Sequence, residues 1–521
     1  MIEFIEKNLK TIISFLMVLL GGLLLLPKFL PLMINADSYA ILLPKILMDK
    51  TGFLGGQLGM NGDYFFPLFY RGGFSLVILL MSKWCNVSEL VMAKGWILAA
   101  YVASGVLIFF LLRKIYQSNR VGLAGAAMLY LSYSFRSWSM VTMAEIPTIC
   151  LILGAITILV YSEKNIGWIL SALIMGVAFC FRLEMVVLLL LVGLIYNTMR
   201  KNLKELVYYV WISMIVWLGY QLFLYLFSYD ANFWLSDQLS KIGLVLEYHE
   251  LFFAFAICLL GFWLMWKIQP LLTIIPIGLL GYYFWHIGGN WQVNWQPLWM
   301  FVWHDLPLMI IFGVSLLLAL LRKEKKVLMW LVGILLLVFL YFSRGEYRYY
   351  VHVVVLLVVV AAYVWKWLEK KLMINKWLMI LWWLLIIVMV SGQLYFDLME
   401  DFLPTIGYEQ SVAIKTKEVM ENNNIEANVV VCSVFSEAIY YETRHASMDC
   451  FDGLKDIMRN NTDKLVVIDE DMARHQPETV EYLEKNGEKI EEEWIMTAYQ
   501  EKNTKSVPQY PVRWILIKNE G

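Results

Sequence analysis

Two carboxylates stand where long apolar segments of the chain begin or end. Asp37 follows the apolar run 12–32, and Glu145 precedes another apolar run, two residues before Pro147. A charged side chain at the edge of a membrane span is costly unless it faces water or a partner, so each carboxylate is a candidate for chemistry. Either can act as a general base toward a hydroxyl group. The structural alternatives are a helix cap for Asp37 and a carboxylate at the positive end of a helix for Glu145.

Arginines stand at two further boundaries of this kind. Arg182 and Glu184 mark the tip of a tight hairpin, and Arg344 and Arg348 precede a later apolar run. The planar guanidinium binds phosphate bidentately, so these cations suit a phosphate leaving group. With two acids they predict sugar transfer from a lipid phosphate, in which a base activates the acceptor hydroxyl and a cation or a metal stabilises the departing phosphate. Arg182 and Glu184 can instead pair with each other, and Arg344 and Arg348 can anchor in the headgroup layer.

A third set of candidates is aromatic. Residues 285–305 combine Trp with Asn and Gln side chains, and Trp291 and Trp295 lie in the middle of this stretch. Such a surface can stack on a sugar ring and bond its hydroxyl groups, which suggests donor or acceptor binding. An aromatic belt at the headgroup level explains the Trp equally well, although not the amides. His304 and Asp305 offer a metal-binding or base pair, but a single His-Asp dipeptide is not specific.

The elements that carry these residues are predicted to be membrane spans. The chain has 521 residues, of which 60% are hydrophobic and only 16% are charged, whereas soluble proteins average about 25% charged. Apolar runs close to the length that a bilayer needs alternate with short polar breaks, which predicts about thirteen spans. The net charge of −1 provides no field that favours nucleic acid.

Positive charges are unevenly distributed among the polar breaks. They cluster in every second break, at residues 113–120, 164, 200–204, 267, 322–326 and 366–376. By the positive-inside rule these breaks are cytoplasmic, which places all the candidate residues above on the outside. The first apolar run has no cleavage site after it, so we expect a retained helix. The prediction is a multi-pass plasma-membrane protein with a cytoplasmic N-terminus.

The composition divides the chain into two predicted domains. Residues 1–395 form the transmembrane part, and residues 396–521 are polar and charged. Short apolar strands at 428–432, 465–468 and 513–517 alternate with helices at 436–442 and 477–485, which predicts a small extracytoplasmic α/β domain. Cys432 and Cys450 can pair if this domain is outside. Its role is a lid or an acceptor-docking module, or else a structural cap.

Four motifs resemble those of the GT-C superfamily of integral membrane glycosyltransferases, and most closely its protein O-mannosyltransferases and lipid A aminoarabinose transferase. The motifs are Asp37-Ser38-Tyr39, Phe66-Pro67-Leu68, Glu145-Ile146-Pro147 and Arg348-Tyr349. The resemblance is best over about the first 200 residues, as judged by span length and charge. The middle of the chain and the C-terminal domain match only in layout.

This resemblance implies a GT-C-like fold and an inverting transfer from a polyprenyl-phosphate sugar donor. It implies that Asp37 is the catalytic base, that Glu145 orients the site or binds a divalent metal, and that Arg348 binds the donor phosphate. The other candidates for donor or acceptor binding are Tyr349, Arg344, Arg182, Tyr39, Glu184, Trp291, Trp295 and His304. The chain departs from the family in having Ser38 where a second acid is frequent, which leaves metal use open.

The predicted function is therefore the transfer of a sugar from a polyprenyl-phosphate donor to an extracytoplasmic acceptor, which is a cell-envelope glycan, a lipid or a protein. The alternative is a transporter or flippase of lipid-linked saccharides, which predicts inverted repeats and charges near the bilayer midplane. The sequence shows no such repeat, and its charges gather on one face. A polysaccharide polymerase or ligase predicts a large outside loop rich in Arg and His. A non-enzymatic sensor leaves the carboxylates at the span ends unexplained.

Overall fold

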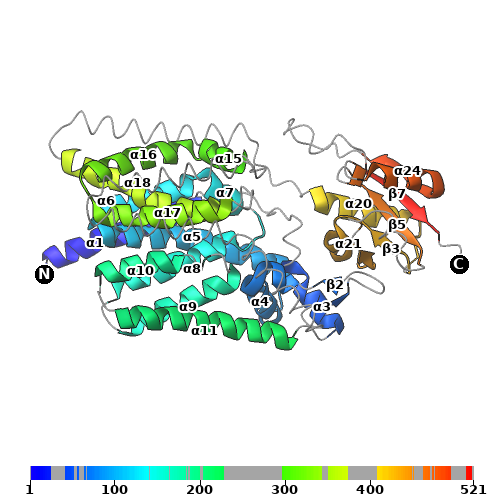
Figure 1. The fold of residues 1–521 in the computed structure, drawn as a ribbon, viewed down its shortest axis with the longest axis horizontal. Helices are drawn as coiled ribbons and strands as arrows, with labels where there is room; N and C mark the ends of the chain where they lie inside the picture. The colour runs from blue at the N-terminus through cyan, green and yellow to red at the C-terminus, as the bar shows by residue number, and fades with distance from the viewer. Residues whose placement is uncertain are drawn as a thin grey trace, which may run out of the picture.

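The protein consists of a helical bundle and a small α/β unit, which lie side by side along the longest axis (Figure 1). The computed structural model describes residues 2–24, 41–51, 56–57, 64–65, 67–139, 141–162, 165–182, 185, 188–199, 203–227, 296–342, 350–372, 408–426, 428–448, 450, 462–469, 472–473, 476–494 and 512–518.

The bundle is built from apolar helices. They are α1 (Ile2–Leu24), α4 (Pro67–Cys85), α5 (Glu89–Tyr116), α6 (Asn119–Leu131), α7 (Tyr133–Ser139), α8 (Glu145–Tyr161), α9 (Asn165–Phe181), α10 (Leu188–Met199), α11 (Leu203–Phe227), α15 (Gln296–His304), α16 (Leu306–Leu321), α17 (Lys325–Phe342) and α18 (Val351–Leu372). Runs of leucine, valine and aromatic residues on nearly all sides of these helices are typical of membrane spans.

Within the described residues, three helices are long and apolar enough to cross a membrane, at Glu89–Tyr116, Glu205–Leu226 and Val351–Glu369. Leu298–His304 and Leu306–Leu321 would form a fourth span, bent by 90° at its break. The chain is therefore a membrane protein. The total of thirteen spans stays a prediction, because residues 228–295 and 373–407 lie outside the described part of the chain.

Side-chain contacts fix the direction of the helices around α5. The Tyr161 hydroxyl near the end of α8 donates to the Phe110 carbonyl of α5 (3.0 Å), so α5 and α8 run in the same direction. The chain returns through α6, whose Tyr130 donates to the Val102 carbonyl in the first half of α5 (2.8 Å). The end of α6 and the start of α8 thus lie at the same end of the bundle, which we call the Glu145 end.

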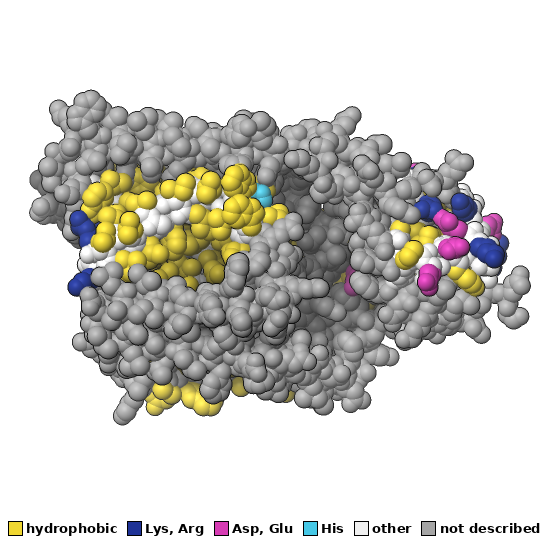
Figure 2. All heavy atoms as spheres, turned by 45° about the horizontal axis from the view of Figure 1, so that its top comes forward, with side chains coloured by type: hydrophobic (Ala, Val, Ile, Leu, Met, Phe, Trp, Pro, Cys, Tyr) yellow, Lys and Arg dark blue, Asp and Glu magenta, His cyan; other side chains and the backbone are white. Residues whose placement is uncertain are grey.

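The opposite end of the bundle is basic. The basic residues there are Arg113 and Lys114 in the last turn of α5, Arg120 at the start of α6, and Arg322 after α16. Figure 2 shows an apolar face of the bundle with Lys and Arg side chains at one end and a His at the other. This separation agrees with the charge pattern of the sequence, and the direction of the bundle in the membrane stays a prediction.

Helix α18 lies at the centre of the bundle. The Ser315 hydroxyl of α16 donates to the Ala361 carbonyl (2.8 Å), and the Tyr116 hydroxyl of α5 donates to the Val359 carbonyl (2.8 Å). Its side chains are buried from Val351 to Trp365. A helix that is apolar on all sides is expected to be buried, which explains why the valine-rich segment takes this position.

The C-terminal α/β unit extends from α20 to β7. Its elements are α20 (Tyr408–Asn422), β3 (Val430–Cys432), α21 (Ser436–Thr443), β4 (Ser447–Met448), β5 (Lys464–Ile468), α24 (Pro477–Asn486), β6 (Glu488–Trp494) and β7 (Val512–Ile517). The strand order is β4-β3-β5-β7-β6, in which β3 pairs in parallel with β4 and β5, and β7 pairs antiparallel with β5 and β6. The three strands and two helices expected from the sequence are confirmed, whereas α20, β4 and β6 were not predicted.

The sheet separates two cores, and its strands contribute to them in alternation. On β5, Leu465 and Val467 point into one core, while Val466 and Ile468 point into the other. Successive side chains of a strand point to opposite faces, so a strand buried on both faces is apolar throughout. This explains the uninterrupted run from Leu465 to Ile468 in the sequence.

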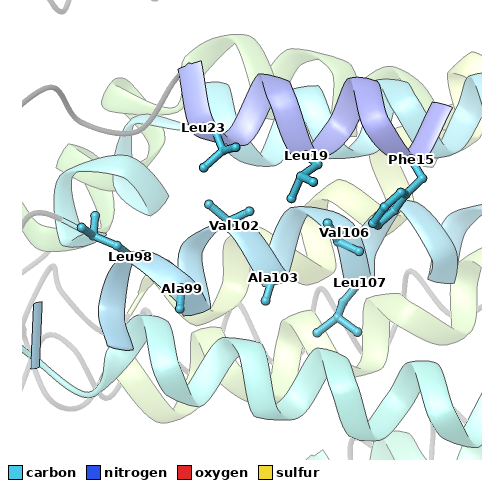
Figure 3. Close-up of a pocket in the computed structure, with 9 residues that line it drawn as sticks. All are labelled: Phe15, Leu19, Leu23, Leu98, Ala99, Val102, Ala103, Val106 and Leu107. Carbon is cyan, nitrogen blue, oxygen red and sulfur yellow. The ribbon is translucent and has the colours of Figure 1, made fainter. Parts of the chain in front are cut away.

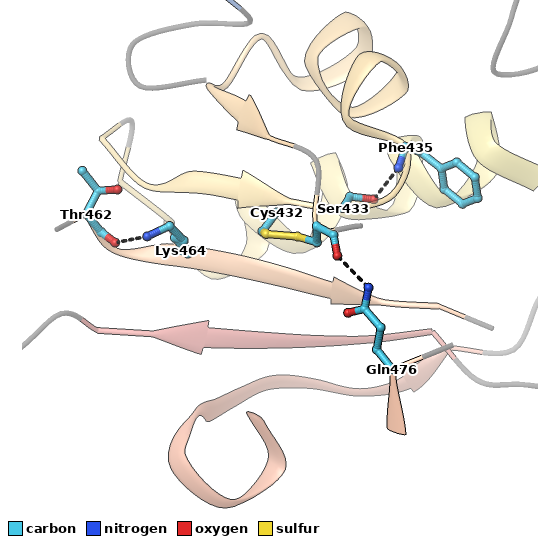
Figure 4. The surroundings of a disulfide bond; sticks show 7 residues. Cys432, Ser433, Phe435, Thr462, Lys464 and Gln476 are labelled. Carbon is cyan, nitrogen blue, oxygen red and sulfur yellow. Dashed lines mark hydrogen bonds between the residues drawn. A yellow bond between two sulfur atoms is a disulfide. The ribbon is translucent and has the colours of Figure 1, made fainter. Parts of the chain in front are cut away.

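A disulfide joins Cys432 at the end of β3 to Cys450 beyond β4, with 5.7 Å between the two Cα atoms (Figure 4). The Gln476 side-chain amide donates to the Cys450 carbonyl (3.1 Å) and ties the bridge to the start of α24. The pairing suggested by the sequence is therefore confirmed.

The first loop after α1 is packed between the bundle and the C-terminal unit. It contains α3 (Pro44–Thr51) and a short antiparallel pair, β1 (Gly56–Gln57) with β2 (Tyr64–Phe65). Leu42, Leu43 and Leu47 belong to the same hydrophobic core as α20 and α21. At the surface, Lys83 of α4 also forms an ion pair with Asp49 of α3 (2.9 Å). Exposed ion pairs of this kind add little to stability.

Candidate functional site

Glu145 is the first residue of α8 and is fully buried. Its Oε1 accepts a hydrogen bond from the guanidinium of Arg182, and the two side chains form an ion pair. Arg182 directly follows α9, where its backbone N–H donates to the Ala178 carbonyl (2.9 Å). The start of one helix favours an anion and the end of another favours a cation, so both helix ends stabilise this pair.

The structure gives Arg182 a different partner from the one that the sequence suggested. Arg182 contacts Glu145, while Glu184, with which it was expected to pair, lies outside the described residues. Both paired side chains are almost without solvent exposure, at 0% for Glu145 and 5% for Arg182. The second oxygen of Glu145, Oε2, has no hydrogen-bond partner in the described part of the chain. Arg182 therefore holds one oxygen of the carboxylate.

Asp305 stands at the bend between α15 and α16 and is also buried. Its carboxylate accepts hydrogen bonds from the Ser132 hydroxyl (2.8 Å), from the Ser134 backbone N–H (3.3 Å) and from the Ser134 hydroxyl. The Ser132 hydroxyl in turn accepts from the Phe135 N–H (3.3 Å). Asp305 thus caps the start of α7 and connects the α15–α16 bend to the loop that leads to Glu145.

His304 packs beside this cap. Its ring stacks on that of Tyr133, with 4.5 Å between ring centroids and an interplanar angle of 25°. The sequence suggested that His304 and Asp305 form a metal-binding or base pair. In the structure the Asp305 carboxylate instead accepts hydrogen bonds from Ser132 and Ser134 at the start of α7. Sequence reasoning missed this role because Ser132 and Ser134 lie more than 170 residues away along the chain, and no local pattern connects them.

Helix α15 presents two exposed tryptophans. Trp299 and Trp303 are 65% and 50% exposed, and their rings stack with 6.3 Å between centroids. On the same helix Phe301 is buried and stacks on Tyr350, at 5.2 Å between centroids. Exposed Trp on one side and a packed side opposite are typical of a helix that lies at a membrane interface. The predicted pair Trp291 and Trp295 lies outside the described residues.

Several other candidates also lie outside the described residues. They are Asp37, Tyr39, Glu184, Arg344, Arg348 and Tyr349. Two of them stand a few positions from described residues in the sequence. Asp37 is four residues before the buried Ile41, and Arg348 is two residues before the buried Tyr350. Tyr350 stacks on Phe301 of α15.

The described residues contain no group of three or more His, Cys, Asp or Glu side chains that could hold a metal ion. A role for a divalent metal therefore stays a prediction that depends on Asp37 and Glu145.

An apolar groove opens between α1 and α5 (Figure 3). Its volume is about 560 Å³, and its lining consists of Phe15, Leu19, Leu23, Leu98, Ala99, Val102, Ala103, Val106 and Leu107. These side chains have no polar atoms, so the groove cannot recognise a phosphate or a sugar. Hydrocarbon chains are its fitting occupants.

Comparisons with known proteins identify the fold. No protein-family model matches the sequence, and no curated protein sequence matches it. A solved structure that does match is the crystal structure of the Archaeoglobus fulgidus oligosaccharyltransferase in complex with zinc and sulfate. The match has a TM-score of 0.51 and 11% sequence identity, and it covers 88% of this chain and 68% of that one. At this identity the likeness concerns the fold alone.

Proposed function

We propose that this protein is a membrane glycosyltransferase of the GT-C type, which transfers a sugar from a polyprenyl-phosphate donor to an extracytoplasmic acceptor with inversion. The acceptor is a cell-envelope glycan, a lipid or a protein. The observation that carries the proposal is the buried Glu145 at the start of α8, paired with Arg182 in a fold similar to that of an oligosaccharyltransferase.

The proposed chemistry divides the work between two carboxylates. Asp37 takes the proton from the acceptor hydroxyl as its oxygen attacks the anomeric carbon. The bond from that carbon to the donor phosphate oxygen breaks, and the phosphate leaves with the bonding electrons. Arg348 and Arg344 stabilise the charge that develops on it, with Tyr349 beside them. Glu145, held by Arg182, orients the site or binds a divalent metal if one is used.

In this proposal Arg182 acts on the donor through Glu145 instead of binding the phosphate itself. Tyr39 and Glu184 are assigned to substrate binding because each stands two residues after a proposed site residue, Asp37 or Arg182, in the sequence. Trp291, Trp295 and His304 are assigned to binding of the donor or the acceptor. His304 is the described member of this last group, and it lies beside the capped start of α7.

The location of the site supports an extracytoplasmic reaction. Figure 1 shows the C-terminal unit beyond the end of the bundle at which α7 and α15 lie. That unit contains the Cys432–Cys450 disulfide, and disulfides persist in oxidising compartments outside the cytosol. The basic end of the bundle is then cytoplasmic. We therefore propose a plasma-membrane protein with a cytoplasmic N-terminus and with residues 396–521 outside.

The test uses membranes that contain the full chain and a panel of radiolabelled polyprenyl-phosphate sugars. We expect Asp37→Asn and Glu145→Gln to abolish transfer. Asp49→Asn is the matched control, because Asp49 is an exposed acid in the same loop and pairs only at the surface with Lys83. Parental rates in Asp37→Asn and Glu145→Gln would show that the site is wrongly assigned. A parental protein that transfers none of the sugars would contradict the function itself.

One observation favours the second candidate, a flippase of lipid-linked saccharides. The 90° break between α15 and α16, with the buried Asp305 at the bend, resembles the discontinuous helices of transporters. The two candidates differ in their product. A flippase moves a fluorescent lipid-linked saccharide across the bilayer of proteoliposomes without changing it, whereas the proposed enzyme releases a polyprenyl phosphate.

A further inference from the structure

The chain passes from one hydrophobic core to another at the start of α3. Ile41 is fully buried in the core of the bundle, whereas the next two residues, Leu42 and Leu43, are fully buried in the core of the C-terminal unit. One turn later Leu47 joins the same unit, and its neighbour Met48 packs on α4 and α11. Helix α3 is therefore wedged between the two parts of the protein.

The surface of the C-terminal unit that receives α3 is formed by helices α20 and α21. Val412 and Ala413 of α20, with Ile439 and Tyr440 of α21, are all buried in the core that contains the three leucines. The start of α5 contributes to the same contact through Leu90, which packs on this core. The core on the other face of the sheet contains no residue of the bundle or of the first loop among those described.

The pKa of Tyr441 is consistent with this packing. Burial raises the pKa of Tyr441 on α21, and the nearby charges of Glu89 at the start of α5 and of Glu442 raise it further. This agrees with the packing of Leu90, at the start of α5, on the core of the C-terminal unit.

The acid of the first loop is attached directly to this wedge. Asp37 lies four residues before Ile41 in the sequence, so the segment that carries the proposed base is covalently attached to the residues that enter the two cores. A catalytic group must be held close to its productive position, and a displacement of about 1 Å can reduce the rate by about a hundredfold. Any movement of α3 changes the anchor of the segment that carries Asp37.

We propose that the C-terminal unit is the clamp that positions the first loop, with Leu43 and Leu47 as positioning residues for the acid at Asp37. This inference rests on the proposed function, because it assigns a role to the loop that carries the proposed base. In this arrangement the unit is neither a free lid nor a passive cap. It supplies one of the two surfaces between which α3 is packed.

The experiment compares leucine-to-alanine changes on opposite faces of one sheet, in the full chain reconstituted into bilayers. Leu43→Ala and Leu47→Ala remove side chains of the clamp. Leu483→Ala is the matched control, because Leu483 of α24 is equally buried but belongs to the core on the other face. All three variants leave a cavity in a core of the C-terminal unit. Only Leu43→Ala and Leu47→Ala remove side chains that hold α3 in place.

Two readouts are measured at a temperature at which every variant is folded. We expect the clamp variants to lower kcat by roughly ten- to a hundredfold with an almost unchanged KM for the donor, and to speed hydrogen exchange in residues 41–51. Leu483→Ala should leave exchange there at the parental rate and lower kcat by no more than about threefold. Leu47→Met, which keeps the volume, should restore kcat. If Leu43→Ala does not fold, Ile46→Ala tests the edge of the same contact.

The outcomes separate this inference from the proposed function. Equal losses of kcat in Leu47→Ala and Leu483→Ala would overturn the clamp, since the unit would then act through stability alone. Parental kcat in a variant with faster exchange would overturn it as well. A parental protein without transferase activity contradicts the proposed function, and the exchange rates still decide whether the C-terminal unit orders the first loop.

Discussion

Replacing Arg182 by Met, with Glu145 left in place, removes the described partner of a fully buried carboxylate. Loss of one member of a buried ion pair leaves an uncompensated charge and typically destabilises a protein by about 3–5 kcal/mol. Both side chains are at most 5% exposed, so solvent does not screen the pair, and we expect a value in this range. Glu145→Leu alone should also be destabilising, because it removes the carboxylate that the Arg182 guanidinium contacts.

The double variant Glu145→Leu with Arg182→Met distinguishes structure from chemistry. Apolar residues of similar volume often replace a buried ion pair at little cost, so the double variant should be more stable than either single variant. It should nevertheless transfer no sugar, because the carboxylate is absent. The stabilities are measured by thermal unfolding in detergent, and the rates by the polyprenyl-phosphate assay in membranes.

Two results would refute this reasoning. Recovery of transfer in the double variant would show that the pair only holds α8 against α9 and that Glu145 takes no part in the reaction. Single variants as stable as the parent, to within about 1 kcal/mol, would show that the pair is less desolvated than the structure indicates.

Three further predictions concern packing, capping and pH. Gly105→Ala should destabilise the bundle by about 1–3 kcal/mol, because the added Cβ would overlap the Tyr130 ring, while Gly95→Ala on the same helix meets open space and should be neutral or slightly stabilising. Asp305→Ala should cost about 1–3 kcal/mol and expose residues 132–144 to protease, whereas Asp305→Asn keeps an acceptor and should cost less. Burial lowers the pKa of His445, so the unfolded state binds more protons, and the C-terminal unit should lose stability as the pH falls below about 6.5. Thermal unfolding of His445→Asn at several pH values should show a weaker dependence, and an unchanged dependence would contradict the role of His445.

The strands of the C-terminal unit could be predicted because their signal is local. The runs at 428–432 and 465–468 are short, apolar and rich in valine, and strands buried on both faces of a sheet require such a pattern. The edge strands are different: β6 has the sequence Glu-Lys-Ile-Glu-Glu-Glu-Trp, which is mostly charged. It becomes a strand because β7 offers it hydrogen bonds, and no property of the segment alone shows this.

The site could be predicted as a collection of residues but not as an arrangement. Glu145 and Arg182 were each identified from their position at the end of an apolar run. Their pairing depends on where α9 ends beside the start of α8, and the sequence left Glu184 as the nearer partner of Arg182. Asp305 shows the same limit, since a carboxylate that caps a distant helix has no sequence pattern of its own.

The same reasoning explains why the role of the C-terminal unit was left open between a lid, a docking module and a cap. The deciding contact joins Leu42, Leu43 and Leu47 to residues more than 360 positions later in the chain. In the sequence these leucines belong to the first outside loop, and only the surface of α20 and α21 shows why they are apolar. Because that contact begins five residues after Asp37 in the sequence, a catalytic role for the first loop makes the C-terminal unit part of the machinery that holds the base.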